Sequence, residues 1–192
     1  MNQTLSLLIV LLVGLTACQP EIVSTPSPKV DTPTYLFRYV YRNFAWGATH
    51  QEWLIGTDGH LYEINGAALL SQTEPMENWA VPTDTIGGLP YLSAEQMASN
   101  LSMTLDQGKL VEERELLKLA ALIPKAARGN RSERSDIQGY DMGGFNWYAY
   151  RWDETAQAFE EVFLKKGGTI LQHNKSSAAK KLVRQLEKLK EE

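Results

Sequence analysis

The chain has 192 residues, with 19 lysines and arginines against 23 aspartates and glutamates, which gives a formal net charge of -4. This near-neutral balance argues against a dedicated nucleic-acid binder, because such proteins carry a concentrated basic surplus. The one cysteine, Cys18, excludes both an intrachain disulfide and a metal cluster built from cysteines.

The chain begins with a strongly apolar segment, Leu5 to Leu15, that is followed by Thr16, Ala17 and Cys18. As a helix this segment would span about 16 Å, roughly half of a bilayer core, so it is too short to cross a membrane. An apolar run of this length that ends in small residues is typical of a secretory signal peptide. The tetrapeptide Leu15-Thr16-Ala17-Cys18 resembles the lipobox of bacterial lipoproteins.

This resemblance covers about the first 18 residues and implies a lipid anchor. In bacterial lipoproteins the cysteine thiol receives a diacylglyceryl group and the chain is cleaved directly before it. The resemblance therefore implies that residues 1–17 are removed and that Cys18 is acylated. Two or more acyl chains give stable anchoring, since each buried methylene contributes about 0.8 kcal/mol. The leader, residues 1–4, lacks the lysine or arginine that such signals usually carry.

The residues after the cysteine bear on localisation. In Gram-negative lipoproteins an aspartate directly after the cysteine typically retains the protein in the inner membrane, so by resemblance Gln19 implies the periplasmic face of the outer membrane. Residues 18–34 are rich in proline, serine and threonine and contain too few apolar side chains to fold alone. We interpret them as a tether that reaches about 50 Å when extended. Residues 35–192 then form a single globular domain.

Three strands are expected at the start of this domain. Residues 35–42 alternate Tyr or Phe with aliphatic and basic residues, which is the period-two pattern of a strand. Residues 52–55 and 60–64 flank Asp58-Gly59, a pair that favours a tight hairpin because both positions tolerate a positive φ. Three further strands are predicted near the end of the chain, over residues 145–152, 158–165 and 169–172.

Two helices are expected in the middle of the domain. The first runs from Ser93, which opens a capping box, to Gly108, because apolar residues recur at four-residue spacing as far as Leu105. The second covers residues 110–123 and is stopped by Pro124. The residues of this second helix expected to face the core are Leu110, Leu117, Ala120 and Ala121.

A last helix is predicted after Asn174 or Ser176. Its apolar residues form one stripe that consists of Ala179, Leu182, Val183, Leu186 and Leu189. Together the elements predict an α+β fold. The expected architecture is an antiparallel sheet of about five to six strands in two sections, with about three helices packed on one side.

No recognised catalytic or metal-binding motif follows the tether. The chain lacks the G-x-S-x-G nucleophile elbow, and His50, His60 and His173 do not have the spacing of metal ligands. Asp141 and Asp153 lie near aromatic strands, but a carboxylate pair for glycoside hydrolysis is recognised only by its separation in space. We therefore predict no catalytic residue, no bound metal and no cofactor.

The strand predicted over residues 145–152 is rich in aromatic rings on both faces, and one face carries Tyr148, Tyr150 and Trp152. A sheet that is covered on one side only has a polar outer face, so two explanations remain open. Either both faces of this strand are covered, or these three rings contact a partner, because Tyr and Trp are common at interface hot spots. We take the three as candidate partner-binding residues.

The sequence thus predicts a lipid-anchored, extracytoplasmic protein of the cell envelope whose domain binds a partner and catalyses no reaction. Its expected partners are the membrane, through the lipid on Cys18, and another envelope protein, whereas no nucleic acid is expected. Two alternatives stay open. One is an envelope enzyme without a recognisable motif, and the other is an inhibitor or immunity-like protein that blocks a secreted enzyme or toxin.

Overall fold

The computed structural model describes most of the predicted domain, namely residues 33–43, 49–64, 79–82, 84–86, 89–136 and 143–191. The predicted signal peptide, Cys18 and nearly all of the tether lie outside the described residues, as does Asp141. Within the described ranges, no helix is long and apolar enough to cross a bilayer.

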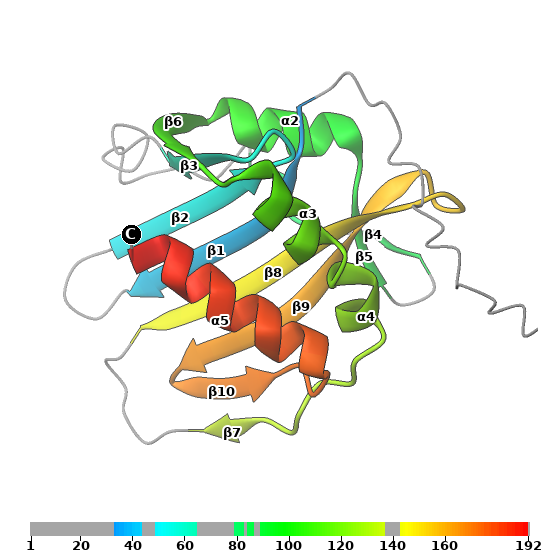
Figure 1. Cartoon of the computed structure of the whole chain (residues 1–192). Helices are drawn as coiled ribbons and strands as arrows, with labels where there is room; N and C mark the ends of the chain where they lie inside the picture. Colours follow the sequence, from blue (N-terminus) through cyan, green and yellow to red (C-terminus); the bar gives the residue numbers. More distant parts are fainter. Residues whose placement is uncertain are drawn as a thin grey trace, which may run out of the picture.

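Ten strands of the described residues form a single antiparallel sheet (Figure 1). They are β1 (Tyr35–Asn43), β2 (Thr49–Gly56), β3 (His60–Ile64), β4 (Asp84–Ile86), β5 (Leu89–Leu92), β6 (Thr104–Leu110), β7 (Ser135–Asp136), β8 (Gly144–Asp153), β9 (Ala158–Gly168) and β10 (Ile170–His173). Eight of them follow the order β4-β5-β9-β8-β1-β2-β3-β6, and β10 pairs with β9 and β7. The six predicted strands are β1, β2, β3, β8, β9 and β10. The two expected sections join because β1 pairs with both β2 and β8.

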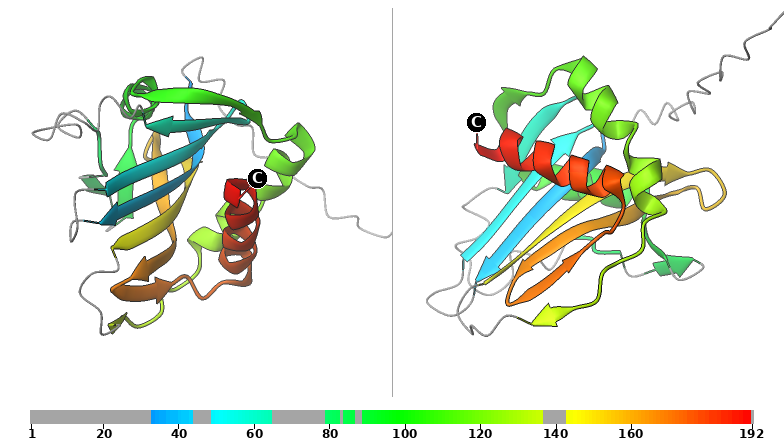
Figure 2. Two further views of the ribbon diagram at one scale, coloured as in Figure 1. Left: turned by 90° about the vertical axis from the view of Figure 1, so that its left-hand side faces the viewer. Right: turned by 60° about the horizontal axis from the view of Figure 1, so that its bottom comes forward.

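The described part of the chain contains four helices: α2 (Ala94–Ser102), α3 (Glu113–Ala120), α4 (Ile123–Ala127) and α5 (Ser177–Glu191). Three of them, α3, α4 and α5, pack on one face of the sheet, where α5 lies across the strands (Figures 1 and 2). The core beneath them includes Phe37 and Trp147 from the sheet and Leu119, Leu182 and Leu186 from the helices. The predicted α+β fold, an antiparallel sheet with helices packed on it, is confirmed.

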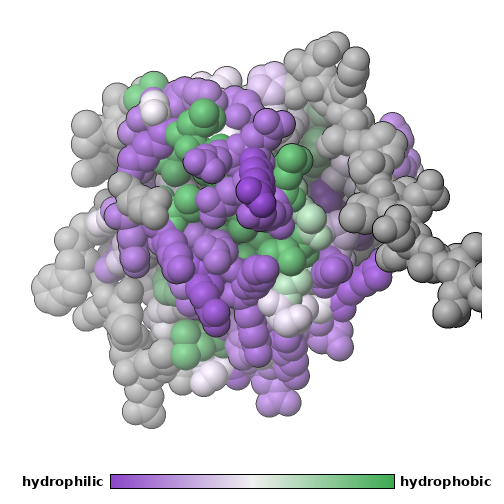
Figure 3. Space-filling model, in the orientation of Figure 1, coloured by the Kyte–Doolittle hydropathy of each residue, from purple (hydrophilic) through white to green (hydrophobic). Residues whose placement is uncertain are grey.

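Hydrophilic side chains dominate the outer surface of α5 (Figure 3). The predicted stripe of this helix is buried beneath that surface, from Ala179 to Leu186, and Leu189 packs at its end. Ser176 caps the helix, because its hydroxyl accepts a hydrogen bond from the backbone N–H of Ala179 at 3.0 Å. The last helix therefore forms as its sequence pattern predicts.

The helix α2 covers the opposite face of the sheet, but only part of it. Its residues Met97 and Leu101 pack in a second core with Tyr35, Leu54 and Tyr150 of the strands. The predicted capping box starts this helix, since Ser93 and the residue three positions later exchange hydrogen bonds. The remainder of this sheet face has no helix over it among the described residues.

Two bulges decide which side chains reach which face of the sheet. In β1 the pairing register shifts between Tyr35 and Phe37, so Tyr35 joins the core under α2 while Leu36 and Phe37 both pack on the α5 side. In β9 a second shift lies opposite the Trp147–Tyr148 step of β8, and it directs Lys166 to the face away from α5. Neither bulge is visible in the sequence pattern.

The first predicted helix is shorter than expected. It ends at Ser102, and Leu105 lies in the strand β6 with half of its surface exposed. The backbone of β6 pairs with β3, from His60 opposite Leu110 to Ile64 opposite Thr104. These ladder hydrogen bonds with the edge of the sheet outweigh the helical spacing, because residue spacing is only a weak local preference.

The second predicted helix is two helices, and three of its four predicted core residues, Leu110, Leu117 and Ala121, are exposed. Leu110 and Leu117 are 63% and 62% exposed. Pro124 does not stop a helix but stands in the first turn of α4, where a missing backbone N–H leaves no hydrogen bond unmade. The residues that enter the core are Leu116, Leu119, Ile123 and Ala126.

Candidate ligand-binding groove

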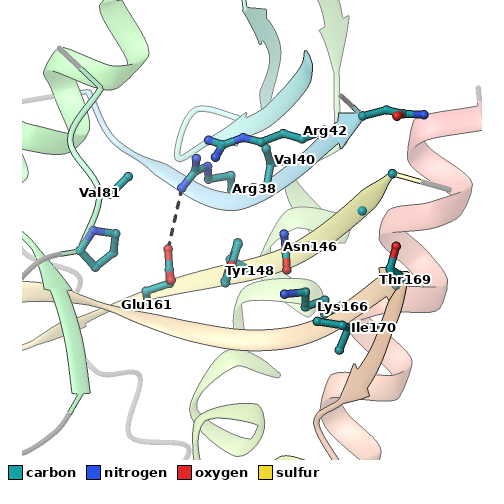
Figure 4. Close-up of a pocket in the computed structure, with 15 residues that line it drawn as sticks. Arg38, Val40, Arg42, Val81, Asn146, Tyr148, Glu161, Lys166, Thr169 and Ile170 are labelled. Carbon is teal, nitrogen blue, oxygen red and sulfur yellow. Dashed lines mark ion pairs between the residues drawn. The ribbon is translucent and has the colours of Figure 1, made fainter. Parts of the chain in front are cut away.

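An open groove of about 810 Å³ lies on the sheet face that α2 leaves uncovered (Figure 4). Its floor is formed by β1, β8 and β9, and its walls come from residues 81–82 and 169–170. Because alternate residues of a strand share a face, β1 contributes Arg38, Val40 and Arg42 to this floor. The volume lies in the range that small-molecule sites occupy.

A glycine lies in the floor of the groove where β8 begins. Gly144 is flanked by Arg42 on β1 and Gly168 on β9. A Cβ atom on Gly144 would meet no atom closer than the carbonyl oxygen of Gly167, at 3.6 Å. The backbone therefore does not require glycine here, although glycine weakens a strand, and a strand glycine often marks a place where another molecule approaches closely.

Two basic side chains, Arg42 and Lys166, line the groove without an ion pair among the described residues. The strand register places Asn146 directly beside Lys166 and beside Val40. In Figure 4 Asn146 lies between β1 and Lys166, on the same face as both basic residues. This end of the groove is therefore electropositive and offers amide, guanidinium and ammonium donors.

The other end of the groove rests on a buried charge network. The guanidinium of Arg38 forms an ion pair with Glu52, which is fully buried, and its Nη1 lies 4.0 Å from Oε2 of Glu161. His50 Nε2 lies 2.9 Å from the second oxygen of Glu52, and the hydroxyl of Tyr150 donates to Glu161 at 2.7 Å. Each buried charge thus has a partner, as burial in a low-dielectric interior requires.

Burial shifts the protonation equilibria of this network. Burial opposes the charge on Arg38, but the Glu52 carboxylate raises the pKa of Arg38 well above its usual value. Burial raises the pKa of Glu161, although the Tyr150 hydroxyl and Arg38 both act in the opposite direction. Burial also raises the pKa of Tyr150 well above its usual value. At neutral pH Arg38 is therefore a fixed cation and Tyr150 a neutral hydrogen-bond donor.

No known protein family matches the chain, and no curated protein and no solved structure is similar to it. Function is therefore inferred from the groove and its side chains.

The three candidate partner-binding residues do not share an exposed surface. Tyr150 is 0% exposed and makes an edge-on ring contact with Tyr35 at 4.9 Å. Trp152 is half-buried against Phe159, with ring centroids 5.1 Å apart. Of the three, only Tyr148 lines the groove. The helix α5 and its neighbours cover one face of this strand, and the core under α2 covers the part of the other face that holds Tyr150.

The histidines lie apart from one another. His50 belongs to the buried network, His60 pairs with Asp106 at 2.8 Å near the hairpin, and His173 ends β10. Asp153 accepts a hydrogen bond from Tyr91 at 3.0 Å. Among the residues that the structure describes, no group of three or more His, Cys, Asp or Glu residues is close enough to hold a metal ion.

Apart from Tyr148, the residues that line the groove were not identified from the sequence. The sequence signal that pointed to this groove was the alternation along β1, where Arg38 and Arg42 alternate with aromatic residues that face the other side of the sheet. That pattern shows that two arginines share a face. It does not reveal that Lys166 and Glu161 of β9 lie across the same floor, because this depends on strand order and on the bulge in β9.

Proposed function

We propose that this protein is a lipid-anchored, extracytoplasmic binding protein that holds a ligand in the groove of its sheet and catalyses no reaction. The lipobox resemblance at Leu15 to Cys18 supports the anchor, with Gln19 favouring the outer membrane in a Gram-negative host. The groove supports the binding role. The membrane is one partner of the protein, and the ligand in the groove is the other.

The observation that carries the binding role is the open floor at Gly144. If β8 served only to stabilise the fold, a side chain at position 144 would make the strand more stable, and the backbone has room for one. Instead the floor stays hollow, and the neighbouring side chains of Arg42, Asn146 and Lys166 surround the hollow with polar groups. A concave site with a few convergent polar groups is the usual form of a small-molecule site.

The anchor is tested by metabolic labelling of the full-length protein with radioactive palmitate in its native host. We expect label in the wild type and none in Cys18→Ser, together with release of the variant from the membrane fraction. Equal labelling of both proteins would exclude acylation of Cys18. A signal peptide without lipidation would leave the wild type unlabelled and outside the membrane fraction.

Ligand binding is tested with protein taken from the native envelope in a membrane-solubilising polymer, without detergent. Small molecules that co-purify are extracted and identified by mass spectrometry. We expect a compound in the wild type that is absent from Gly144→Leu, in which the leucine fills the groove. Lys118→Leu is the matched control, because Lys118 is exposed on α3 and lies outside the groove lining. No difference between wild type and Gly144→Leu would contradict a binding role for the groove.

A further inference from the structure

We infer that the groove binds an amphipathic anion, a ligand with a carboxylate or phosphate head and an aliphatic body. The head lies over Gly144, between Arg42 and Lys166, and the body lies along the apolar wall. This inference rests on the proposed function, since it names the class of ligand that the same groove takes.

The spacing of the two cations suits a single anionic group. Arg42 lies on β1 and Lys166 on β9, with β8 between them. The backbones of β1 and β9 are two strand spacings, about 10 Å, apart. The two long side chains can therefore reach one head group from opposite sides. Arg42 supplies a planar fork of donors and Lys166 a compact charge, both suited to carboxylate and phosphate oxygens.

The charges of the groove are unequal between its two ends. Glu161, the carboxylate that lines the groove among the described residues, already accepts a hydrogen bond from Tyr150 and faces Arg38. Arg38 is in turn neutralised by Glu52 of the neighbouring strand β2. The positive charge that lacks a partner in the described structure is therefore concentrated at Arg42 and Lys166, over the hollow at Gly144.

Apolar atoms border the rest of the groove. Val40 forms part of the floor, and Val81, which is 46% exposed, forms a wall with Pro82. Ile170 borders the groove at the opposite wall. A small inorganic anion would leave the exposed surfaces of Val81, Pro82 and Ile170 in water, whereas an aliphatic chain attached to the head would bury them. The combination of a cationic end and apolar walls selects for amphipathic anions over simple ions.

The test uses the full lipidated protein in nanodiscs of neutral phosphatidylcholine. Binding of octanoate, octyl phosphate and octyl glucoside below their micelle concentrations is measured by calorimetry, with protein-free discs as the reference. Inorganic phosphate is included to separate the head from the aliphatic body. We expect both anionic amphiphiles to bind at least 10-fold more tightly than octyl glucoside, which has the same chain but no charge, and inorganic phosphate to bind most weakly.

The double variant Arg42→Gln/Lys166→Gln is expected to lose at least 10-fold in affinity for both anions. Lys109→Gln/Lys118→Gln removes two exposed cations outside the groove and is expected to leave the affinity unchanged. If the head belongs to a membrane lipid, discs with phosphatidylglycerol will compete with octanoate. A free amphiphile as natural ligand predicts no competition.

Three results would overturn the inference. One is equal affinity for octyl glucoside and octanoate, another is an unchanged affinity in the Arg42 and Lys166 double variant, and the third is failure of every probe to bind. If octyl glucoside and octanoate bind equally well and both lose affinity in Gly144→Leu, the groove is still a binding site, but not one for anions. The proposed function is tested separately by the ligand that co-purifies from the native envelope.

Discussion

The side-chain amide of Asn100 hydrogen-bonds both backbone groups of Ala80. Its Oδ1 accepts from the Ala80 N–H at 2.8 Å, and its Nδ2 donates to the Ala80 carbonyl oxygen at 2.8 Å. The same Nδ2 donates to the Tyr35 hydroxyl at 3.0 Å. Asn100 is fully buried, so one side chain of α2 joins the segment before Val81 to the first strand. This arrangement holds one wall of the groove.

We predict that Asn100→Ala lowers the free energy of unfolding by about 2–4 kcal/mol, because it removes the hydrogen bonds to the part-buried backbone of Ala80 and to the buried Tyr35 hydroxyl. Chemical denaturation followed by circular dichroism measures this change. Ser99→Ala, one position earlier on α2 and exposed, is expected to change it by less than about 0.5 kcal/mol. A loss in Asn100→Ala that is no larger than in this control would show that the hydrogen bonds to Ala80 do not stabilise the fold.

The ion pair between Arg38 and Glu52 gives a second prediction. Their side chains are 5% and 0% exposed, so removing one charge takes from the other its principal buried partner. Arg38→Met and Glu52→Leu are each expected to lower the free energy of unfolding by about 3–5 kcal/mol.

The double variant Arg38→Met/Glu52→Leu is expected to be more stable than either single variant, since neither buried charge of the pair then remains. Urea unfolding of the four proteins completes the double-mutant cycle. If the two losses simply add, the pair is not coupled, and the buried network described above is not held by this contact.

Local chemistry explains why part of the fold could be predicted from the sequence. The Asp58-Gly59 turn, the Ser93 capping box and the apolar stripe of α5 each depend on residues close in the chain. The groove depends on residues far apart in the chain. Arg42 and Lys166 line the same groove only because β1 and β9 flank β8 and because a bulge in β9 turns Lys166 to that face. Strand order and bulges are set by tertiary packing, which periodicity does not encode.

Two glycines at neighbouring positions in the sheet are expected to respond oppositely to alanine. Gly144 has room for a Cβ atom, so Gly144→Ala is expected to raise the free energy of unfolding by about 0.5 kcal/mol by restricting the unfolded chain. Gly168 has φ +99°, and a Cβ atom there would lie 2.1 Å from the Gly143 carbonyl oxygen. Gly168→Ala is therefore expected to lower the free energy of unfolding by about 2 kcal/mol or more.

Thermal and urea unfolding of both glycine variants test this contrast. A strong loss of stability in Gly144→Ala would show that the backbone, and not a ligand, requires glycine in the floor of the groove. That result would remove the main support for the binding role.

Glu161 gives a prediction on pH. It is faced by Arg38 of β1, Glu52 of β2 and Tyr150 of β8, and by Arg131, which precedes β7. Burial raises its pKa above the value of an unfolded glutamate. Between the two pKa values the folded state binds more protons than the unfolded state. The contribution of Glu161 to the free energy of unfolding must therefore fall as the pH rises through this interval, from about 4.5 upward.

The measurement is the difference in free energy of unfolding between the wild type and Glu161→Gln across this pH range. We expect the difference, wild type minus variant, to decrease as the pH rises. Glu95→Gln is the opposite control, because the Ser93 hydroxyl lowers the pKa of Glu95. The charged Glu95 carboxylate stabilises the fold, and this stabilisation is lost as the pH falls. The difference in free energy of unfolding between the wild type and Glu95→Gln is therefore expected to increase with pH. An increase for Glu161 as well would mean that the Tyr150 hydrogen bond and Arg38 outweigh burial at this carboxylate.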